Sequence, residues 1–403
     1  MISDQKRTKV VIIGGGFAGI EAARFLGKNS LPVDVTLVSN SPCFQYYPSL
    51  YRLVVGASVN QVSIPLSKTL PKKVQLIIDT YTAIDPARKV ISLQSGKEIS
   101  YDYAVLTLGS EPNYFGINGM ETQSKSFLSI DKALALKQHF SDLLEKSKTL
   151  SAEEIKIQLH TIIVGAGPSG VELAGALRPY LVELAKKNAI DETFITVDLL
   201  DSSPRVLATI PEHASALVAD QLQKNGITIY TNYGVNACED NCVIVTDKNT
   251  NTENIHMKAG TIIWTAGTKI NSAFANIPRV VMTDKKRVQV SPTLTLPTDD
   301  SIYIAGDGAG TQFSGLAQTA VDHGQYVGKT IAQRIAGIPT SPFEPKQGVF
   351  VIPVGRKWAI LNFKDFVMSG FTPWIMRIMV DARYFLSIAS LGTVLGMLRK
   401  STK

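Results

Sequence analysis

The chain has few cysteines, few charged residues and no long apolar run. Three cysteines in 403 residues exclude a disulfide scaffold. Charged residues make up 19% of the chain, below the roughly 25% usual for soluble globular proteins, while hydrophobic residues make up 45% and exclude a mainly disordered chain. No stretch reaches the roughly 18–20 apolar residues of a membrane-spanning helix. The nearest stretch, residues 384–398, is short and contains serine, glycine and threonine.

The excess of positive charge is also small. The 41 Lys and Arg outnumber the 34 Asp and Glu by seven, which permits nucleic acid or an anionic membrane as a partner and identifies neither. Residues 1–8 contain charges and lead directly into Val10–Ile13, so we expect no signal peptide. At roughly 150 residues per domain, the length predicts two or three domains.

A glycine-rich turn follows the first apolar segment. The β-branched run Val10–Ile13 predicts a buried parallel strand, and residues 20–26 predict a helix. Between them stands a Gly-x-Gly-x-x-Gly spacing, which is typical of a turn whose backbone N–H groups hold a dinucleotide pyrophosphate at a helix N-terminus. The residues expected to contact this dinucleotide are Gly14, Gly16, Phe17, Ala18 and Gly19.

The same arrangement occurs a second time. Residues 161–164 predict a strand, and the following turn contains Gly165, Gly167, Ser169 and Gly170. Each turn is followed by another β-rich segment, residues 33–38 and 194–200. The repeated pattern predicts two dinucleotide sites in one chain.

The second site contains acidic residues of its own. Asp201 follows the strand at 194–200, where an acid bonds a ribose 2′-OH and repels a 2′-phosphate, so NADH is favoured over NADPH. Arg205 acts against this preference. Glu172 stands in the first turn of the helix that follows the glycines, which is also a favourable place for a negative charge.

Three further apolar segments end in glycine. Residues 301–305 lead into Gly306-Asp307, where the aspartate could bond a ribityl hydroxyl of a flavin or act as a helix cap or turn residue. Segments 103–108 and 261–266 end at Gly109 and Gly267, and such ends suit a chain that crosses between domains near a bound nucleotide.

These motifs resemble those of the two-dinucleotide-binding-domain flavoproteins, the glutathione-reductase-like superfamily. The resemblance implies an α/β fold with two Rossmann-like domains, in which an NAD(P)H-binding domain interrupts an FAD-binding domain. The expected FAD-binding parts are residues 1–115 and 290–335, and the NAD(P)H-binding part is 116–289. Residues 336–403 form a family-specific C-terminal region.

The cysteines argue against two branches of this superfamily. Disulfide reductases often carry two cysteines shortly after the first turn, and only Cys43 lies there. Sulfide:quinone oxidoreductases need a cysteine pair at the flavin, one from the C-terminal half, and no cysteine follows Cys242. We interpret Cys238 and Cys242 as structural residues of a turn or loop.

The remaining sequence resembles the type II NADH:quinone oxidoreductases. Residues 44–51 look like the family's aromatic-Pro-Leu-Leu-Tyr segment beside the flavin, and residues 109–119 are close to its Gly-Ser-x-x-Asn-Tyr-Phe-Gly crossover. The resemblance implies that Glu172 helps orient the nicotinamide over the flavin. Residues 317–324 resemble the Ala-Gln-x-Ala-x-Gln-Gln-Gly motif, which places Ala317 and Gln318 at the quinone side of the isoalloxazine.

Two positions depart from the family pattern. The Gln-Gln pair is Asp322-His323 here, and we expect His323 to bond a quinone carbonyl or supply a proton. Ser39 stands where an acid usually bonds the adenosine ribose of FAD, so it offers a hydroxyl without charge assistance.

The C-terminal region, residues 366–398, predicts an amphipathic helix. Arg377, Asp381 and Tyr384 fall on one face, with a basic flank from Arg383 and residues 399–403. This pattern is typical of a helix in the plane of an anionic membrane; a helix packed on the FAD domain or in a dimer is the alternative. The apolar face comprises Ile375, Ile378, Met379, Ala382, Leu386 and Ala389.

We therefore predict an FAD enzyme that oxidises NADH and passes two electrons to a membrane quinone without pumping protons. It is expected at the cytoplasmic face of the cell membrane as a peripheral protein, with a possible homodimer, no nucleic-acid partner and no metal site. Two alternatives remain open: a soluble NAD(P)H reductase with another acceptor, and an apoptosis-inducing-factor-like redox interaction protein.

Overall fold

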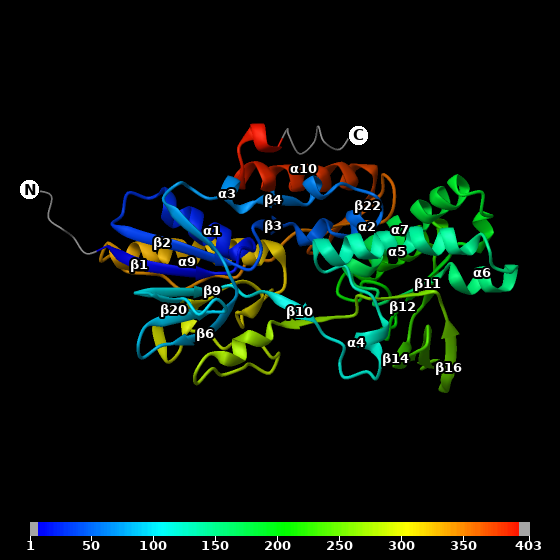
Figure 1. Cartoon of the computed structure of the whole chain (residues 1–403), viewed down its shortest axis with the longest axis horizontal. Helices are drawn as coiled ribbons and strands as arrows, with labels where there is room; N and C mark the ends of the chain where they lie inside the picture. Colours follow the sequence, from blue (N-terminus) through cyan, green and yellow to red (C-terminus); the bar gives the residue numbers. More distant parts are fainter. Residues whose placement is uncertain (1–6, 395–403) are drawn as a thin grey trace, which may run out of the picture.

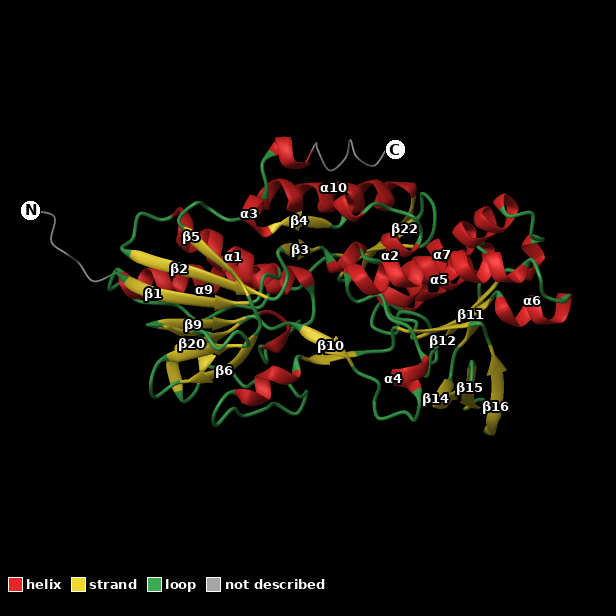
Figure 2. Cartoon of the chain, in the orientation of Figure 1, coloured by secondary structure: helices red, strands yellow, loops and turns green. Residues whose placement is uncertain are grey.

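The computed structural model describes residues 7–394, in which two α/β units lie next to each other (Figure 1). Helix α10 (Phe371–Ile388) lies along one side of the molecule, over parts of both units. Each unit has a central parallel sheet with helices packed on it (Figure 2). The predicted fold class, two Rossmann-like units, is confirmed.

The first unit is built on a six-stranded sheet in the order β19-β20-β9-β1-β2-β5. Alternate residues of β1 enter different cores: Val10 and Ile12 pack toward helices α1 (Phe17–Lys28) and α9 (Ala317–Ile335), whereas Val11 and Ile13 pack toward a three-stranded meander. The sheet strands are β1 Thr8–Ile13, β2 Val33–Ser39, β5 Val74–Ile78, β9 Tyr103–Leu106, β19 Thr295–Leu296 and β20 Asp299–Ile304, and the meander strands are β6 Tyr81–Asp85, β7 Val90–Leu93 and β8 Glu98–Ser100.

The second unit has a four-stranded parallel sheet in the order β13-β12-β11-β17. A second meander, β14 (Tyr233–Glu239), β15 (Cys242–Asp247) and β16 (Thr252–Lys258), packs on it through Val243 and Val245. Its sheet strands are β11 His160–Val164, β12 Thr196–Leu200, β13 Thr228–Tyr230 and β17 Thr261–Trp264, and its helices are α4 Met120–Gln123, α5 Ile130–Ser147, α6 Ala152–Gln158, α7 Pro168–Lys187 and α8 Glu212–Lys224.

Two antiparallel strands connect the units. Strand β10 (Ser110–Pro112) leaves the first unit after Gly109, and β18 (Thr268–Ile270) returns after Gly267. The Asn271 N–H donates to the Gly109 carbonyl and the Asn113 N–H to the Gly267 carbonyl, both at 3.0 Å. The two crossovers predicted at these glycines are therefore one paired ribbon.

The chain returns to the first unit earlier than position 290. Phe274, Ile277 and Val288 are buried in the core between the six-stranded sheet and the first meander, although the predicted boundary assigned them to the second unit. A short 3-10 turn, Ser272–Asn276, contributes Phe274 to that core, and a turn of this length gives no strand or helix pattern in the sequence.

The C-terminal part begins with a sheet, which the sequence pattern did not predict. Strands β21 (Phe350–Pro353), β22 (Ala359–Phe363) and β23 (Phe366–Gly370) pair antiparallel, so residues 366–370 are a strand and the helix starts at Phe371. Across residues 7–394, no helix has the length and apolar character needed to cross a membrane. The basic residues expected at 399–403 lie outside the described residues.

The segment between β2 and β5 reaches across to the second unit. Helix α2 (Tyr51–Val54) packs its buried residues into the core formed by α5 and α7. Short elements around it place residues 43–70 beneath α10 (Figure 1): β3 Cys43–Gln45, β4 Ser63–Pro65, α3 Leu66–Thr69 and two 3-10 turns, Tyr47–Ser49 and Val59–Gln61.

Candidate functional site

Close backbone contacts require glycine at two of the three glycine positions of the first turn. Gly14 has φ +108°, and a Cβ there would lie 2.3 Å from the carbonyl oxygen of Thr107. A Cβ on Gly19 would lie 1.9 Å from the Gly14 carbonyl oxygen. A side chain at Gly14 would therefore displace backbone at the carboxyl end of β9, and a side chain at Gly19 would displace the backbone of the glycine turn itself.

Gly16 is different, because nothing in the protein requires glycine there. Its φ of −84° is open to any residue, and no protein atom lies within 4 Å of a Cβ at this position. The space beside Gly16 at the start of α1 is therefore left free by the fold. A pyrophosphate held by the first N–H groups of α1 would occupy such a space.

The second turn repeats this geometry. A Cβ on Gly165 (φ +109°) would lie 2.5 Å from the Ala266 nitrogen, and one on Gly170 would lie 1.8 Å from the Gly165 carbonyl oxygen. Gly167, with φ −73°, again has no protein atom within 4 Å of a Cβ. The two turns, each at the carboxyl end of a sheet's strands, thus have open space at the equivalent glycine, Gly16 in the first and Gly167 in the second.

The helices that start at these turns have no side-chain caps. The first turns of α1, α7 and α9 receive no side-chain hydrogen bond at their N-caps, whereas Ser129 and Ser151 cap α5 and α6. Uncapped N–H groups and a positive helix end attract phosphate. Helices α8 and α10 also lack a side-chain cap, so it is the glycine turns, with their open positions at Gly16 and Gly167, that make α1 and α7 fit the pyrophosphate of a dinucleotide.

Gly306 lies beside the start of α1, and the flavin contact expected of Gly306 and Asp307 stays a prediction. A Cβ on Gly306 would lie 3.5 Å from Cβ of Ala18 and 3.8 Å from Cβ of Ala320, so the loop joins the starts of α1 and α9. The Asp307 carboxylate accepts a hydrogen bond from Ser110 Oγ at 2.8 Å. Ala317 and the exposed Gln318 begin α9 at the same place, where Gln318 donates to Asp322 at 2.9 Å.

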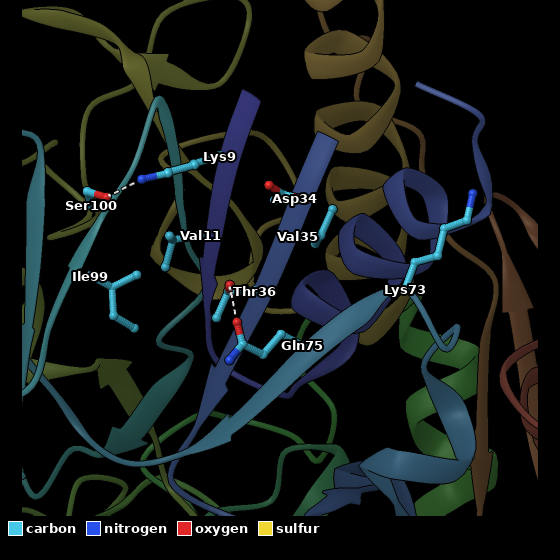
Figure 3. A pocket seen from close by; sticks show the side chains of 9 residues that line it. All are labelled: Lys9, Val11, Asp34, Val35, Thr36, Lys73, Gln75, Ile99 and Ser100. Atoms are coloured by element: carbon cyan, nitrogen blue, oxygen red, sulfur yellow. Dashed lines mark hydrogen bonds between the residues drawn. The ribbon is translucent and has the colours of Figure 1, made fainter. Parts of the chain in front are cut away.

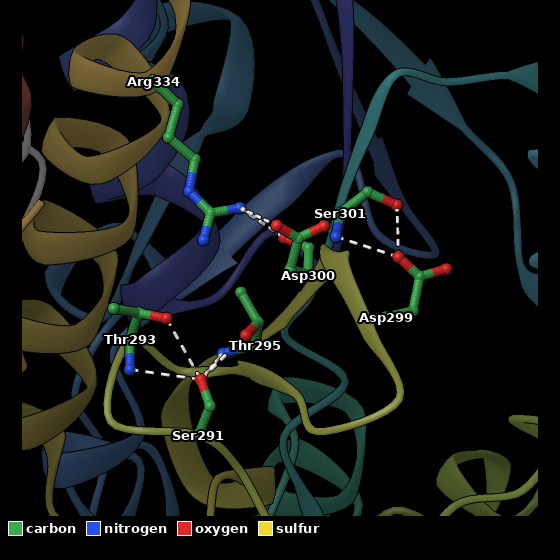
Figure 4. Close-up of polar contacts among 7 residues, drawn as sticks. All are labelled: Ser291, Thr293, Thr295, Asp299, Asp300, Ser301 and Arg334. Carbon is green, nitrogen blue, oxygen red and sulfur yellow. Dashed lines mark hydrogen bonds and ion pairs between the residues drawn. The ribbon is translucent and has the colours of Figure 1, made fainter. Parts of the chain in front are cut away.

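The hairpin before Gly306 is fixed by polar side chains (Figure 4). Ser291 Oγ accepts from the backbone N–H groups of Thr293 and Thr295, and the Asp299 carboxylate accepts from Ser301. Arg334 of α9 forms an ion pair with Asp300 at 3.3 Å. These bonds hold β20 in register and so set where Gly306 and Asp307 emerge.

His323 lies inside the protein and not at its surface. The ring has no solvent exposure, and its Nδ1 accepts a hydrogen bond from the Gly306 N–H at 3.1 Å. The proton of the neutral ring is therefore on Nε2, which is 3.1 Å from Thr311 Oγ1. Both nitrogens are used within the protein, and burial lowers the pKa to about 4. This geometry speaks against the expected quinone-side role.

Replacing His323 with alanine is expected to lower the free energy of unfolding by about 2–4 kcal/mol, because it empties a buried site and leaves the Gly306 N–H unpaired. Asparagine can still accept that bond and should lose less. Quinone turnover of the folded asparagine variant should stay within about threefold of the unsubstituted protein. Thermal unfolding and steady-state rates measure both effects, and a selective loss of quinone turnover would restore the substrate-side role.

The depressed pKa of His323 also predicts acid sensitivity. The unfolded chain binds this proton below its ordinary pKa of 6.5, whereas the folded chain binds it only below about 4. The stability that comes from the neutral ring is therefore fully present above pH 6.5 and is lost as the pH falls toward 4.

Ser39 and Asp201, the two residues expected to bond a ribose, form hydrogen bonds within the protein. Ser39 is buried, and its hydroxyl proton is bonded to the Ser41 carbonyl at 2.8 Å, so it can only accept a bond from a ribose hydroxyl. The Asp201 carboxylate accepts from the Ala166 N–H at 2.6 Å and from the Ser203 N–H at 2.7 Å. Asp201 thus holds the second glycine turn, with lone pairs left for a ribose.

Arg205 does not point to a phosphate position. Its guanidinium donates to the carbonyl oxygens of Ala208 and Ile210, each at 2.8 Å, within its own loop. The side chain therefore stabilises that loop and does not oppose the preference for NADH that Asp201 favours.

Glu172 lies buried in α7 and faces charges from outside its own unit. It is 8% exposed, and burial raises its pKa to about 7, while Arg377 and Arg52 act to lower it. Sequence reasoning found Glu172 but missed both arginines, because they are 325 positions apart and come from α2 and α10. A carboxyl group that titrates near neutral pH can exchange protons during turnover.

Helix α10 packs with the face that the sequence assigned to solvent. Asp381 is 5% exposed, and Tyr384 contacts the rings of Phe17 and Tyr46 with centroids 5.1 and 5.8 Å apart. These residues of the predicted polar face lie inside, where Asp381 forms ion pairs and Tyr384 packs against aromatic rings, as in the alternative of a helix packed on the FAD domain. Phe385 and Ile388 on the same face were the signal that could have revealed this.

A cavity of about 330 Å³ lies elsewhere in the first unit (Figure 3). It is lined by residues of β1, β2, β5 and β8, among them Lys9, Asp34 and Gln75. Lys9 donates to Ser100 at its edge, at 2.9 Å. Open α/β sheets bind their ligands at the carboxyl ends of the strands. The residues that line this cavity stand earlier in their strands, so the cavity is separate from the glycine turns.

The comparisons with known proteins agree with this arrangement. Residues 8–324 match the family model described as pyridine nucleotide-disulphide oxidoreductase. The type II NADH:quinone oxidoreductase of Mycobacterium tuberculosis is 30% identical to the chain, over 97% of this chain and 87% of the relative. The chain belongs to the type II NADH:quinone oxidoreductases.

A further relative and a solved structure support the fold over almost the whole chain. The enzyme of Staphylococcus haemolyticus is 25% identical over 96% of this chain and 98% of its own. The structure of NDH2 from Plasmodium falciparum in complex with NADH superposes with a TM-score of 0.86 at 19% identity, covering 98% of this chain and 97% of that one.

The cysteines of this type II enzyme form no disulfide among the described residues. All three are free, and Cys238 and Cys242 stand on neighbouring strands, not in the loop that we predicted. Cys242 pairs with Glu239 while Cys238 pairs with Val243, so the two thiols point to opposite faces of the hairpin. Their structural role stays a prediction, and burial raises the pKa of Cys238 to about 11.

Proposed function

We propose that the chain binds FAD at the α1 turn and NADH at the α7 turn, and that it reduces a membrane quinone. The membership of the family makes it an FAD-dependent NADH:quinone oxidoreductase. The observation that carries the residue assignment is the connection of the two turns. Gly14 packs on the end of β9, Gly165 packs on the end of β17, and the β10–β18 ribbon joins these two strand ends.

Each turn has a defined task in this proposal. The first N–H groups of α1 hold the FAD pyrophosphate, and Asp307 bonds the ribityl chain while the start of α9, at Ala317 and Gln318, lies at the quinone side. A bound FAD would supply the redox chemistry, as the acceptor of the hydride of NADH and the donor of two electrons to a quinone. The chain's own contribution is to bind, orient and exclude water.

Glu172 is a carboxyl group that can supply the proton consumed in the reduction of the quinone. One NADH, one quinone and one proton give NAD⁺ and one quinol, so each turnover takes up a proton. A buried carboxyl with a pKa of about 7 holds that proton in about half of the molecules at neutral pH. We propose that Glu172 orients the nicotinamide and supplies this proton, and we assign no proton step to His323.

Steady-state oxidation of NADH with several acceptors tests the proposed function. Turnover should be fast with short-chain quinones and slow without an acceptor. NADPH should give a lower kcat/KM, because Asp201 repels a 2′-phosphate and Arg205 is occupied. Flavin that NADH bleaches but quinone does not reoxidise would contradict the proposed acceptor.

We further propose that α10 attaches the enzyme to the cytoplasmic surface of an anionic membrane, where NADH is available. Its outward face is apolar: Ile378 is 42% exposed and Met379 is 57% exposed. Asp381 is the single carboxylate of residues 366–394, and it points inward, so the outward face shows no negative charge. The exposed apolar side chains of residues 366–394 are Phe366, Phe371, Ile375, Ile378, Met379, Val380, Leu386 and Leu391.

Replacing Ile378 and Met379 together with glutamate is expected to weaken binding to anionic vesicles by about tenfold or more, because two charges would enter the apolar boundary. Co-sedimentation with vesicles that contain phosphatidylserine measures this. Val281 and Met282, which are exposed elsewhere, provide a matched control pair. Unchanged sedimentation of the α10 variant with loss of a dimer in size-exclusion chromatography would identify the face as a contact between two copies.

A further inference from the structure

Phe115, just after strand β10, combines an exposed aromatic ring with a strained backbone. Its side chain is 62% exposed, and its φ of +52° is a left-handed conformation that a bulky residue rarely adopts. Leu207 and Leu294 also have a positive φ, but they are 2% and 1% exposed and lie in the core. Burial therefore compensates the strain at the two leucines and does not compensate it at Phe115.

The neighbouring residues hold Phe115 in this conformation. The side-chain oxygen of Asn113 accepts a hydrogen bond from the Phe115 N–H at 3.0 Å. Asn113 itself is bound to the second unit, since its N–H donates to the Gly267 carbonyl at 3.0 Å and its carbonyl accepts from Trp264 Nε1 at 2.9 Å. Residues 113–115 are therefore attached to the end of β17 and carry the ring with them.

The ring lies over Gly267, beside the second glycine turn. A Cβ on Gly267 would lie 2.8 Å from Cζ of Phe115, so the ring occupies the place of a side chain there. It also meets the ring of Trp264 edge-on, with centroids 6.2 Å apart. The preceding residue, Ala266, is the one on which Gly165 packs. Phe115 thus stands one residue along from the backbone that carries the second turn.

The strand order of the second sheet indicates which half of a dinucleotide passes this strand end. In the order β13-β12-β11-β17, the direction of the crossovers reverses between β11 and β17, and such sheets bind their ligand across that point. Asp201 follows β12 and marks the adenosine ribose, while the start of α7 takes the pyrophosphate. The nicotinamide half then extends to the opposite side, across the end of β17.

We propose that Phe115 is a binding residue for NADH, whose exposed ring packs against the nicotinamide nucleoside. The inference rests on the proposed NADH site at the α7 turn. A ring that the backbone already holds in place loses little conformational freedom when a ligand covers it. It also keeps water from one side of the nicotinamide half. The strain at position 115 then has a use, because it presents an aromatic surface to the ligand.

Stopped-flow reduction of the flavin in the holoenzyme tests this role. Phe115→Asn removes the ring, and asparagine tolerates a positive φ. The NADH concentration for half-maximal reduction rate should rise by about tenfold. The kcat with a soluble quinone at saturating NADH should fall by less than about threefold. Phe115→Tyr keeps the ring and should stay within about twofold of the unsubstituted protein in both measurements.

ADP as a competitive inhibitor shows which half of NADH the ring contacts. It carries the adenosine and the pyrophosphate but no nicotinamide nucleoside. Its inhibition constant should therefore stay within about twofold in Phe115→Asn. An inhibition constant that rises as much as the requirement for NADH would mean that the ring acts on the adenosine half or on the shape of the whole site, and would overturn the proposal.

The unfolding temperature of the apoprotein separates binding from a structural role. Phe115→Gly removes the strain at φ +52°, so its unfolding temperature should equal or exceed that of the unsubstituted apoprotein, while its requirement for NADH rises. A glycine variant that unfolds at a lower temperature, or does not fold, would identify the ring as structural and reject the proposal. If only Phe115→Asn fails to fold, the glycine variant replaces it in both kinetic measurements.

Tyr114→Leu is the matched control. Tyr114 contacts the same Trp264 ring, with centroids 5.9 Å apart, but it packs against the core under the second meander. This variant should lower the unfolding temperature and leave the requirement for NADH unchanged. An equal rise in the requirement for NADH in Tyr114→Leu and Phe115→Asn would mean that both act through Trp264, which also rejects a direct contact.

Gly167→Ala distinguishes this proposal from the proposed NADH site. If Gly167→Ala weakens the use of NADH and Phe115→Asn does not, the site at α7 stands and the role of Phe115 is rejected. If Phe115→Asn weakens it and Gly167→Ala does not, the ring still binds NADH, and it is the assignment of the pyrophosphate to the α7 turn that fails.

Discussion

Replacing Gly16 with alanine is expected to abolish FAD binding, and with it all NADH oxidation, while the chain still folds. The fold leaves at least 4 Å free around a Cβ at this position, and φ −84° suits alanine. A methyl group would occupy the place of the pyrophosphate at the start of α1 and push it away from the helix N–H groups. We expect purified protein without flavin absorbance and turnover reduced by more than about 100-fold.

Gly167→Ala is the matched variant in the second turn, since its surroundings are equally open. It should keep its flavin absorbance but need at least about tenfold more NADH for half-maximal bleaching. The unfolding temperatures of both apoproteins should equal that of the unsubstituted apoprotein. A Gly16→Ala protein with full flavin content and normal turnover would show that the free space serves another purpose.

The second large effect is expected at Glu172. Glutamine keeps the shape of the protonated side chain but can neither release nor take up a proton, so kcat with quinone should fall by about 100-fold. Bleaching of the flavin by NADH consumes no external proton and should be affected much less. Stopped-flow reduction and steady-state turnover, measured on the same preparation, separate the two steps.

The same substitution should stabilise the protein at neutral pH. The folded pKa of Glu172 is about 7 and its ordinary value is 4.5, so the folded state binds more protons between these values. Stability is therefore greatest below pH 4.5 and declines as the pH rises toward 7. The glutamine variant lacks this decline, and the difference in free energy of unfolding should reach about 3 kcal/mol above pH 7. A loss of stability in the variant at pH 7 would mean that the ionised carboxyl is bound more favourably than its burial suggests.

The two glycine turns and the ribbon between the units could be predicted from the sequence because each follows from local rules. Gly14 and Gly19 stand at fixed distances from a β-branched strand, and a strand, a turn and a helix are specified within about 25 residues. Gly109 and Gly267 end strands of the same kind. The sequence could not tell Gly16 from Gly14, because only the folded backbone shows which glycine is needed for packing.

The roles of His323 and Asp381 could not be predicted, because a sequence pattern does not show which partners a side chain meets in the folded protein. The resemblance to a family motif placed His323 near the flavin, and a bond from Gly306 turned its ring inward. The helical period assigned Asp381 to a polar face, but period alone does not say which face meets the protein. Asp381 is inside because Tyr46 and Arg52, more than 300 positions earlier, bind it there.

The paired crossover between the units has a mechanical consequence. A single linker would allow the second unit to turn about it, whereas β10 and β18 are hydrogen-bonded side by side and resist such torsion. The ion pairs of Asp381 with Arg52 and Arg377 add a contact at a separate place, on α10. Two contacts at separate places leave little freedom for domain closure, so we expect the two units to keep the same relative orientation when NADH binds and NAD⁺ leaves.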